Sequence, residues 1–123
     1  MGPLKDITVI EFSGIGPGPY CGMLLADLGA DVIRVSRKGA EGLENKYDIH
    51  NRSKRSITAD LKNKESVAEL LKLIAQVDVV FEGFRPGVME KLGIGPDDCL
   101  KVNPKLVYGR MTGWGQELSL IHI

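Results

Sequence analysis

The stretch Ile7–Pro19, ITVIEFSGIGPGP, decides the fold class of this chain. Its first part, Ile7–Phe12, is short, mostly apolar and rich in β-branched residues, which is typical of a buried strand. Its second part, Ser13–Pro19, is dense in glycine and proline, which interrupt regular structure. Pro19 suits the first position of a helix. A buried strand that passes through a glycine-rich turn into a helix indicates an α/β fold.

The same alternation of strand and helix continues along the chain. Two stripes of apolar residues at helical spacing predict helices, one ending at Gly29 and one capped by Asn63. These stripes are Cys21, Leu24, Leu25 and Leu28, and then Val67, Leu70, Leu71 and Ile74. Further strands are predicted at Asp31–Ser36, Ser56–Leu61, Val77–Glu82 and Leu106–Met111. Short helices are predicted at Gly87–Leu92 and Pro96–Val102, and a long polar loop at Lys38–Arg55.

This pattern predicts a Rossmann-like α/β fold, a parallel sheet with flanking helices. In such folds, ligands bind at the carboxyl ends of the strands. Those ends are expected at Ser13–Pro19, Arg37, Gly83–Pro86 and Thr112–Gln116.

Composition and charge exclude several classes of protein. The 123 residues include 16 basic and 16 acidic side chains, a formal net charge of zero, whereas a nucleic-acid-binding domain would carry a basic excess. No apolar run approaches the roughly 18 residues that span a membrane, and the start lacks the apolar core of a signal peptide. We therefore expect a cytoplasmic protein. Cys21 and Cys99 lie far apart, so neither a disulfide nor a metal site is expected.

The glycine-rich turn and Arg37 are candidate ligand contacts. The turn lacks the G-x-G-x-x-G spacing of dinucleotide-binding loops because residue 19 is proline. A tight turn and a ligand-binding loop are about equally compatible with it. Arg37 follows the second strand, where many NAD enzymes hold an acid for the ribose hydroxyls. A basic residue there suits the ribose phosphate of NADP or coenzyme A, although a solvated surface arginine is the default interpretation of a lone arginine.

Basic residues also gather elsewhere, but no catalytic group can be assigned. Asn51–Arg55 holds three basic residues in five, and Arg85 lies in a turn after the fourth strand. Both are candidate phosphate contacts, with a solvated charged loop as the alternative. His50 and His122 lack a carboxylate or cysteine at useful spacing. Glu11 and Asp27 each lie within a predicted strand or helix and are interpreted as structural or solvated. The residues alone thus indicate a phosphate-bearing ligand and no catalytic machinery.

Several ordered segments together resemble family III CoA-transferases, most closely their α-methylacyl-CoA racemase branch. The resemblance covers about residues 4 to 116. The segments are Val9–Pro19, Leu25–Val35, Asn51–Ser56, Ala59–Lys62, Glu82–Gly93 and Gly109–Gln116.

The resemblance implies the N-terminal part of that fold, truncated here, in an enzyme that forms an interlocked homodimer. It implies binding of an acyl-CoA thioester, with coenzyme A as part of the substrate and no separate cofactor. By the same resemblance Arg37 contacts coenzyme A, as does the segment Ala59, Asp60, Leu61 and Lys62. Arg85 lies in a motif that lines the same region.

The implied reaction interconverts R and S epimers of 2-methylacyl-CoA, in fatty acid metabolism, by exchange of the proton α to the thioester. The acid and base of the family, a histidine and an aspartate, are expected beyond Ile123, so the chain itself should be inactive. Other hypotheses are a CoA-transferase, an NADP-dependent oxidoreductase and a chain that only binds coenzyme A.

The last residues form a separate prediction. Residues 1–116 are expected to form the incomplete coenzyme A-binding domain, and residues 117–123 a non-native tail. Leu118–Ile123 reads as a translation of the transposase end sequence used in sequencing libraries. Codons that differ from that sequence would contradict this prediction.

Overall fold

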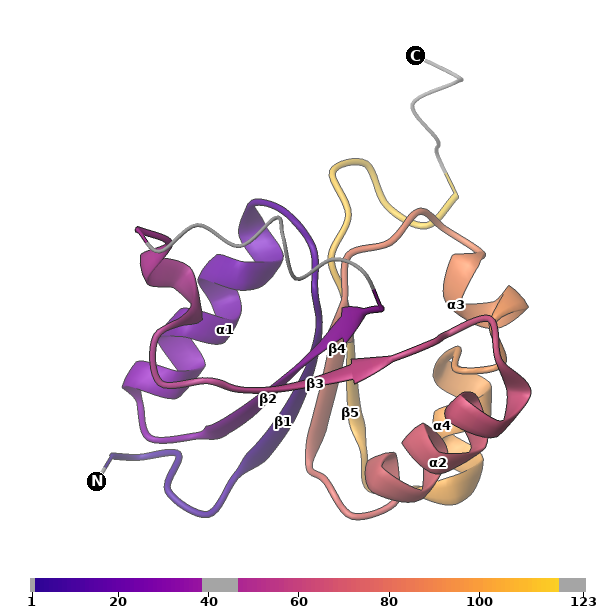
Figure 1. The fold of residues 1–123 in the computed structure, drawn as a ribbon, viewed down its shortest axis with the longest axis horizontal. Helices are drawn as coiled ribbons and strands as arrows, with labels where there is room; N and C mark the ends of the chain where they lie inside the picture. The colour runs from indigo at the N-terminus through magenta and orange to yellow at the C-terminus, as the bar shows by residue number, and fades with distance from the viewer. Residues whose placement is uncertain (1, 39–46, 118–123) are drawn as a thin grey trace.

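Five short strands form one parallel sheet in the order β3-β2-β1-β4-β5 (Figure 1). The computed structural model describes residues 2–38 and 47–117. The strands are β1 (Thr8–Phe12), β2 (Asp31–Arg37), β3 (Arg55–Ala59), β4 (Val79–Glu82) and β5 (Val107–Arg110). This order is that of the first five strands of the doubly wound dinucleotide-binding fold. The predicted α/β fold class is therefore confirmed.

Helices cover both faces of the sheet. On one face lie α1 (Pro17–Asp27) and the 3-10 turn η2 (Ile49–Asn51); on the other lie α2 (Lys64–Ile74), α3 (Val88–Lys91) and α4 (Pro96–Val102) (Figure 1). The predicted cap of α2 is confirmed, because Asn63 Oδ1 accepts the backbone N–H groups of Glu65 and Ser66 at 2.8 and 3.1 Å.

The central strand β1 explains why the two cores form. Val9, Ile10 and Phe12 are at most 2% exposed, as expected for a parallel strand covered on both faces. Ile10 packs toward α2, α3 and α4, whereas Val9 packs toward α1. At the amino end of β1, the backbone N–H of Thr8 donates to Asp78 Oδ2 at 2.9 Å. This bond joins β1 to the residue that leads into β4.

The predicted apolar face of α1 is confirmed for Cys21 and Leu25, which pack against the core, and wrong for Leu24 and Leu28. Leu24 and Leu28 are 42% and 45% exposed, and the helix buries Gly22, Met23 and Ala26 instead. The helix also begins at Pro17 rather than Pro19. The small residues face the sheet because α1 lies too close to β1 for a larger side chain at Gly22, where an added Cβ would lie 1.7 Å from Glu11 Oε1.

The third strand ends earlier than predicted. It stops at Ala59, and Asp60 Oδ1 then accepts the backbone N–H of Lys62 at 3.1 Å, which turns the chain toward α2. Leu61 leaves the sheet and lies in the core beneath α2, 7% exposed. Its side chain is therefore a packing element.

In the part of the chain that the structure describes, no helix is long and apolar enough to cross a membrane. The predicted tail lies outside the described residues apart from Glu117.

Candidate functional site

A pocket of about 660 Å³ opens at the carboxyl ends of β1, β4 and β5. Its walls are the three loops that follow these strands, which gather above the arrowheads in Figure 1. β1 and β4 are neighbours from the two halves of the sheet, whose crossovers lie on opposite faces. Such a switch point is where open α/β sheets bind ligands. The lining residues are Phe12, Gly14, Ile15, Pro17, Gly18, Gly83–Pro86 and Met111–Gly115.

The pocket is mostly apolar. Ile15 and Trp114 stand in its walls at 98% and 59% exposure, and Phe12 and Phe84 meet with ring centroids 6.3 Å apart. Among the residues that line it, Arg85 is the one with a charged side chain. A pocket of this kind suits an uncharged ligand held by shape and apolar contact, with a single cation at the rim.

The start of α1 offers little to a phosphate. Gly16 caps the helix with a φ of 79° and no side-chain hydrogen bond. Pro17 and Pro19 have no N–H, so the first turn lacks donors that a pyrophosphate needs. The glycine-rich turn therefore lines a pocket, as a ligand-binding loop would, but it is not a dinucleotide cradle.

Arg37 and Ala59 lie side by side at the carboxyl ends of β2 and β3, where they are register partners. Arg37, Asp60 and Lys62 are exposed. Ala59 also lines a second hollow of about 590 Å³ between β3 and α2. The structure thus brings together four of the six predicted contacts, and Leu61 can join them only through its backbone because its side chain is buried.

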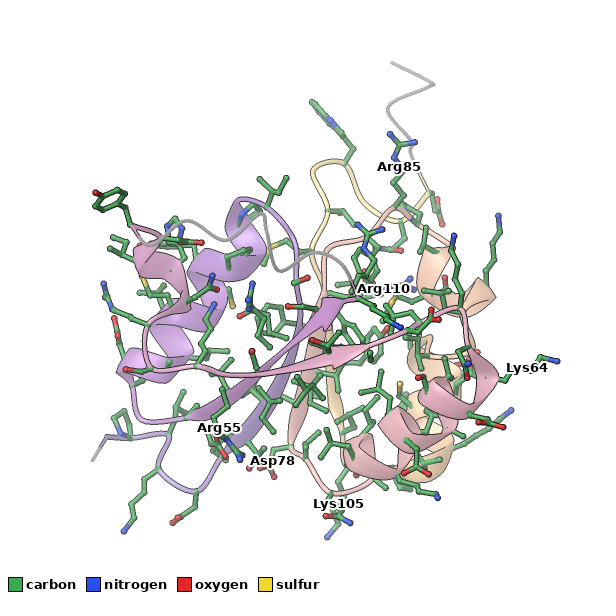
Figure 2. The ribbon with its side chains drawn as sticks, in the orientation of Figure 1. Arg55, Lys64, Asp78, Arg85, Lys105 and Arg110 are labelled. Atoms are coloured by element: carbon green, nitrogen blue, oxygen red, sulfur yellow. The ribbon has the colours of Figure 1, made fainter. Side chains whose placement is uncertain are left out.

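Arg85 belongs to a different group. It is exposed on the loop after β4 and projects away from the sheet at the loop end (Figure 2). β4 is two strands away from β2, so at the usual strand spacing the two groups are about 10 Å apart along one edge. An extended ligand could contact both.

The cations of the basic run Asn51–Arg55 are paired with carboxylates of the fold. Arg52 pairs with Asp27 at 2.5 Å, and Arg55 pairs with Asp31 at 2.5 Å. Lys54 is buried beneath α1. Each of the three cations therefore has a carboxylate partner on α1, β2 or β1, and the run fastens the connection before β3 to the first half of the sheet.

A buried network that sequence reasoning missed lies under the pocket. Glu82 is 1% exposed; its Oε2 accepts the backbone N–H of Phe84 at 2.8 Å, and its Oε1 accepts from Arg110 Nε at 3.2 Å. Arg110 reaches on toward α3, where its Nη2 lies 2.5 Å from Glu90 Oε1 (Figure 2). Burial raises the pKa of Glu82, opposed by the Phe84 N–H and Arg110. The sequence signal that could have revealed this network was an acidic residue, Glu82, at the end of one strand and a basic residue, Arg110, at the end of its neighbour.

The other titratable candidates have structural surroundings. Burial raises the pKa of the Cys99 thiol to about 11, so it packs as a small apolar group. His50 lies edge-on to Tyr20, away from the residues that line the pocket, and His122 lies outside the described residues. Within residues 2–38 and 47–117, no group of three or more His, Cys, Asp or Glu side chains could hold a metal ion.

Comparison with known proteins places this geometry in a family. The α-methylacyl-CoA racemase of Mus musculus is 50% identical over 113 residues, which are 92% of this chain and 29% of that enzyme. The succinyl-CoA–D-citramalate CoA-transferase of Chloroflexus aurantiacus is 38% identical over 93% of this chain and 31% of its own length. The chain thus spans about a third of these relatives.

Solved structures agree. A crystal structure of Rv3272 from Mycobacterium tuberculosis superposes with a TM-score of 0.90 at 41% identity, over 97% of this chain and 34% of that protein. The sequence profile of CoA-transferase family III matches residues 4–119. The strand order, the switch-point pocket and this match lead to one conclusion: the chain belongs to CoA-transferase family III.

Proposed function

We propose that this chain is the acyl-CoA-binding portion of a 2-methylacyl-CoA racemase. The observation that carries the proposal is the division of one sheet edge into a basic end at Arg37 and Lys62 and an apolar pocket at the switch point. Coenzyme A thioesters have the same division, with phosphates on the nucleotide and an uncharged arm that ends in the acyl group.

The nucleotide is assigned to the β2–β3 end. Arg37 and Lys62 are exposed cations there, and charge-assisted bonds to phosphate are among the stronger hydrogen bonds. The hollow beside Ala59 supports placing the adenosine against the segment Ala59–Lys62. Asp60 is tied to the Lys62 N–H and holds that segment in its turn.

The pantetheine arm and the acyl group are assigned to the pocket between the loops after β1, β4 and β5. Arg85 at its rim has room to contact the arm or a phosphate. The lining contains no group that could accept a proton at neutral pH, since a guanidinium stays protonated. We infer that this part of the enzyme binds and orients the thioester, and that the acid and base belong to another part of an interlocked dimer.

A CoA-transferase is the second candidate. It is favoured by the 38% identity to the Chloroflexus transferase and would use the same binding edge. The higher identity to the mouse racemase supports the first candidate. The proline-rich start of α1 argues against a dinucleotide in the pocket, and so against an NADP-dependent oxidoreductase.

Trp114 provides the test, because it is the single tryptophan of the chain and stands in the pocket wall. We expect its fluorescence to change saturably on titration with coenzyme A, more strongly with 2-methylacyl-CoA, and little with NADP. Deuterium exchange at the α carbon of 2-methylacyl-CoA, measured on the intact enzyme in heavy water, then separates a racemase from a transferase. A response to NADP with none to acyl-CoA would overturn the proposal.

A further inference from the structure

Lys54 makes a buried connection between β1 and the start of α1. Its side chain is 1% exposed and that of its partner Glu11 is 0% exposed, with Nζ 2.8 Å from Glu11 Oε1 and 3.1 Å from Oε2. The same ammonium also donates to the backbone carbonyl of Pro19 at 3.0 Å. One cation thus bridges a strand and the first turn of a helix.

The two ends of this bridge adjoin the walls of the pocket. Glu11 precedes Phe12, and Pro19 follows Gly18, and both Phe12 and Gly18 line the pocket. The space around the bridge is tight: a Cβ on Gly22 would lie 1.7 Å from Glu11 Oε1 and 2.9 Å from Lys54 Nζ. The helix start therefore has no room to shift toward the sheet while the pair is in place.

The first turn of α1 lacks the usual means of holding itself. Gly16 supplies no side-chain cap, and the described first turn contains no acidic residue. Two prolines remove backbone donors. The bond from the Tyr20 N–H to the Gly16 carbonyl is long, at 3.3 Å. An external tie is needed to fix the direction of a turn with so few bonds of its own.

A buried ion pair is a poor means of gaining stability, because removing both charges from water costs as much as their attraction returns. Apolar side chains of similar size would fill the same space. The contact that such a replacement could not reproduce is the bond to the Pro19 carbonyl.

We propose that Lys54 is a positioning residue for the pocket, which fixes the Gly14–Gly18 wall by tying the first turn of α1 to β1 through Glu11 and Pro19. The assignment of an acyl-CoA ligand to that wall rests on the proposed function. The role of Lys54 in fixing the wall does not rest on the proposed function.

The test separates positioning from charge balance with two variants of the chain and one control. Lys54→Met leaves the Glu11 carboxylate buried without its ammonium partner, with Arg34 as the remaining cation near it. The double variant Glu11→Met with Lys54→Met removes both charges of the pair and leaves only the bond to the Pro19 carbonyl unreplaced. Arg55→Ala is the matched control, because Arg55 adjoins Lys54 and its pair with Asp31 is exposed. Each protein is assayed by urea unfolding, by amide exchange and by Trp114 titration with 2-methylacyl-CoA.

We expect the double variant to recover most of the stability that Lys54→Met loses. Its amides just after the helix start, Tyr20–Met23, should still exchange at least tenfold faster than in the parent chain, relative to the amides of α2 in the same molecule. Its affinity for the acyl-CoA should stay at least fivefold weaker. Arg55→Ala should change none of these.

Recovery of the Tyr20–Met23 exchange rates and the affinity along with stability in the double variant would overturn the proposal, since Lys54 would then only neutralise Glu11. If Lys54→Met does not fold, the comparison of the double variant with the parent chain decides. If the parent chain fails to bind acyl-CoA, the proposed function fails, but the exchange rates still test the tie.

Discussion

Arg37 and Ala59 are direct register partners, one ending β2 and the other ending β3, although the whole β2–β3 connection separates them along the chain. The pairing explains how a lone arginine and a distant four-residue segment form one surface. Because parallel strands end at the same edge, whatever follows β3 lies beside whatever follows β2. Arg37 and Lys62 are exposed cations on this surface.

Removing the Arg37 charge should weaken binding of coenzyme A. A charge-assisted bond contributes about 1.5–3 kcal/mol, so Arg37→Ala should lower the affinity at least tenfold. Calorimetric titration of the intact enzyme measures it. The matched control is Lys105→Ala, which removes an exposed cation at the opposite end of the sheet (Figure 2) and should leave affinity unchanged. Equal affinities for parent and Arg37→Ala would contradict the assignment.

A charge in the pocket wall should discriminate between free coenzyme A and its thioesters. Ile15 is 98% exposed, so Ile15→Asp should not alter stability. It should weaken the binding of 2-methylacyl-CoA by tenfold or more, because the new carboxylate must lose water against an apolar acyl group. The binding of free coenzyme A should weaken by much less. Val107→Asp, a change of the same kind at the far end of β5, is the control. Equal losses for both ligands would show that the acyl group lies elsewhere.

Gly22 should not accept even one methyl group. Alanine is the better helix former, yet a Cβ there would collide with the buried Glu11 carboxylate, so Gly22→Ala should cost about 1–3 kcal/mol. Gly18→Ala in the same helix meets nothing within 4 Å apart from its chain neighbours, and its better helix propensity is offset by Pro19, which disfavours a helical alanine before it, so stability should change by less than about 1 kcal/mol. Urea unfolding of both variants gives the comparison. A stable Gly22→Ala would mean that α1 lies farther from β1 than described.

The buried carboxyl of Glu82 should make stability depend on pH. Burial raises its pKa above the usual 4.5, so above pH 4.5 the unfolded chain has released a proton that the folded chain still holds. Stability from this group therefore falls as pH rises toward the folded-state pKa. Glutamine does not titrate, and its oxygen can still accept the Phe84 N–H. Glu82→Gln should gain in unfolding free energy relative to the parent chain over that range, as urea unfolding at several pH values would show. A difference in unfolding free energy between Glu82→Gln and the parent chain that stays constant with pH would contradict this prediction.

The sequence predicted the sheet well because β1, β2 and β4 are compact runs of buried apolar residues. It predicted the Asn63 cap because the Asn63 side chain accepts from residues next to it in the chain. The sequence-based prediction failed where contacts between distant parts of the chain determine which residues are buried. Leu24 and Leu28 have the spacing of a buried face, but the close approach of α1 to Glu11 selects Gly22 and Ala26 instead. Spacing alone cannot reveal a carboxylate on another element.

The candidate site, too, was predicted in part from the sequence and missed where distant contacts matter. The resemblance implied that Arg37 and the segment Ala59–Lys62 contact the same ligand, and the structure brings Arg37 and Ala59 together as register partners. It could not show that Leu61 points into the core, since an apolar residue after a strand fits either a ligand contact or a packing role. The run Asn51–Arg55 suggested phosphate binding, but its carboxylate partners are distant in sequence and become neighbours only on folding.

The bond between Thr8 and Asp78 spans 70 residues, and the β1–β4 seam that it joins is the seam on which the pocket opens. Contacts of such sequence separation form slowly, after the local helices and the first three strands can already exist. We therefore expect the pocket to form late in folding. A chain arrested before this seam closes would show helical circular dichroism and a collapsed first half while remaining unable to hold its ligand. Ligand binding is thus a more demanding assay of correct folding than a measurement of secondary structure.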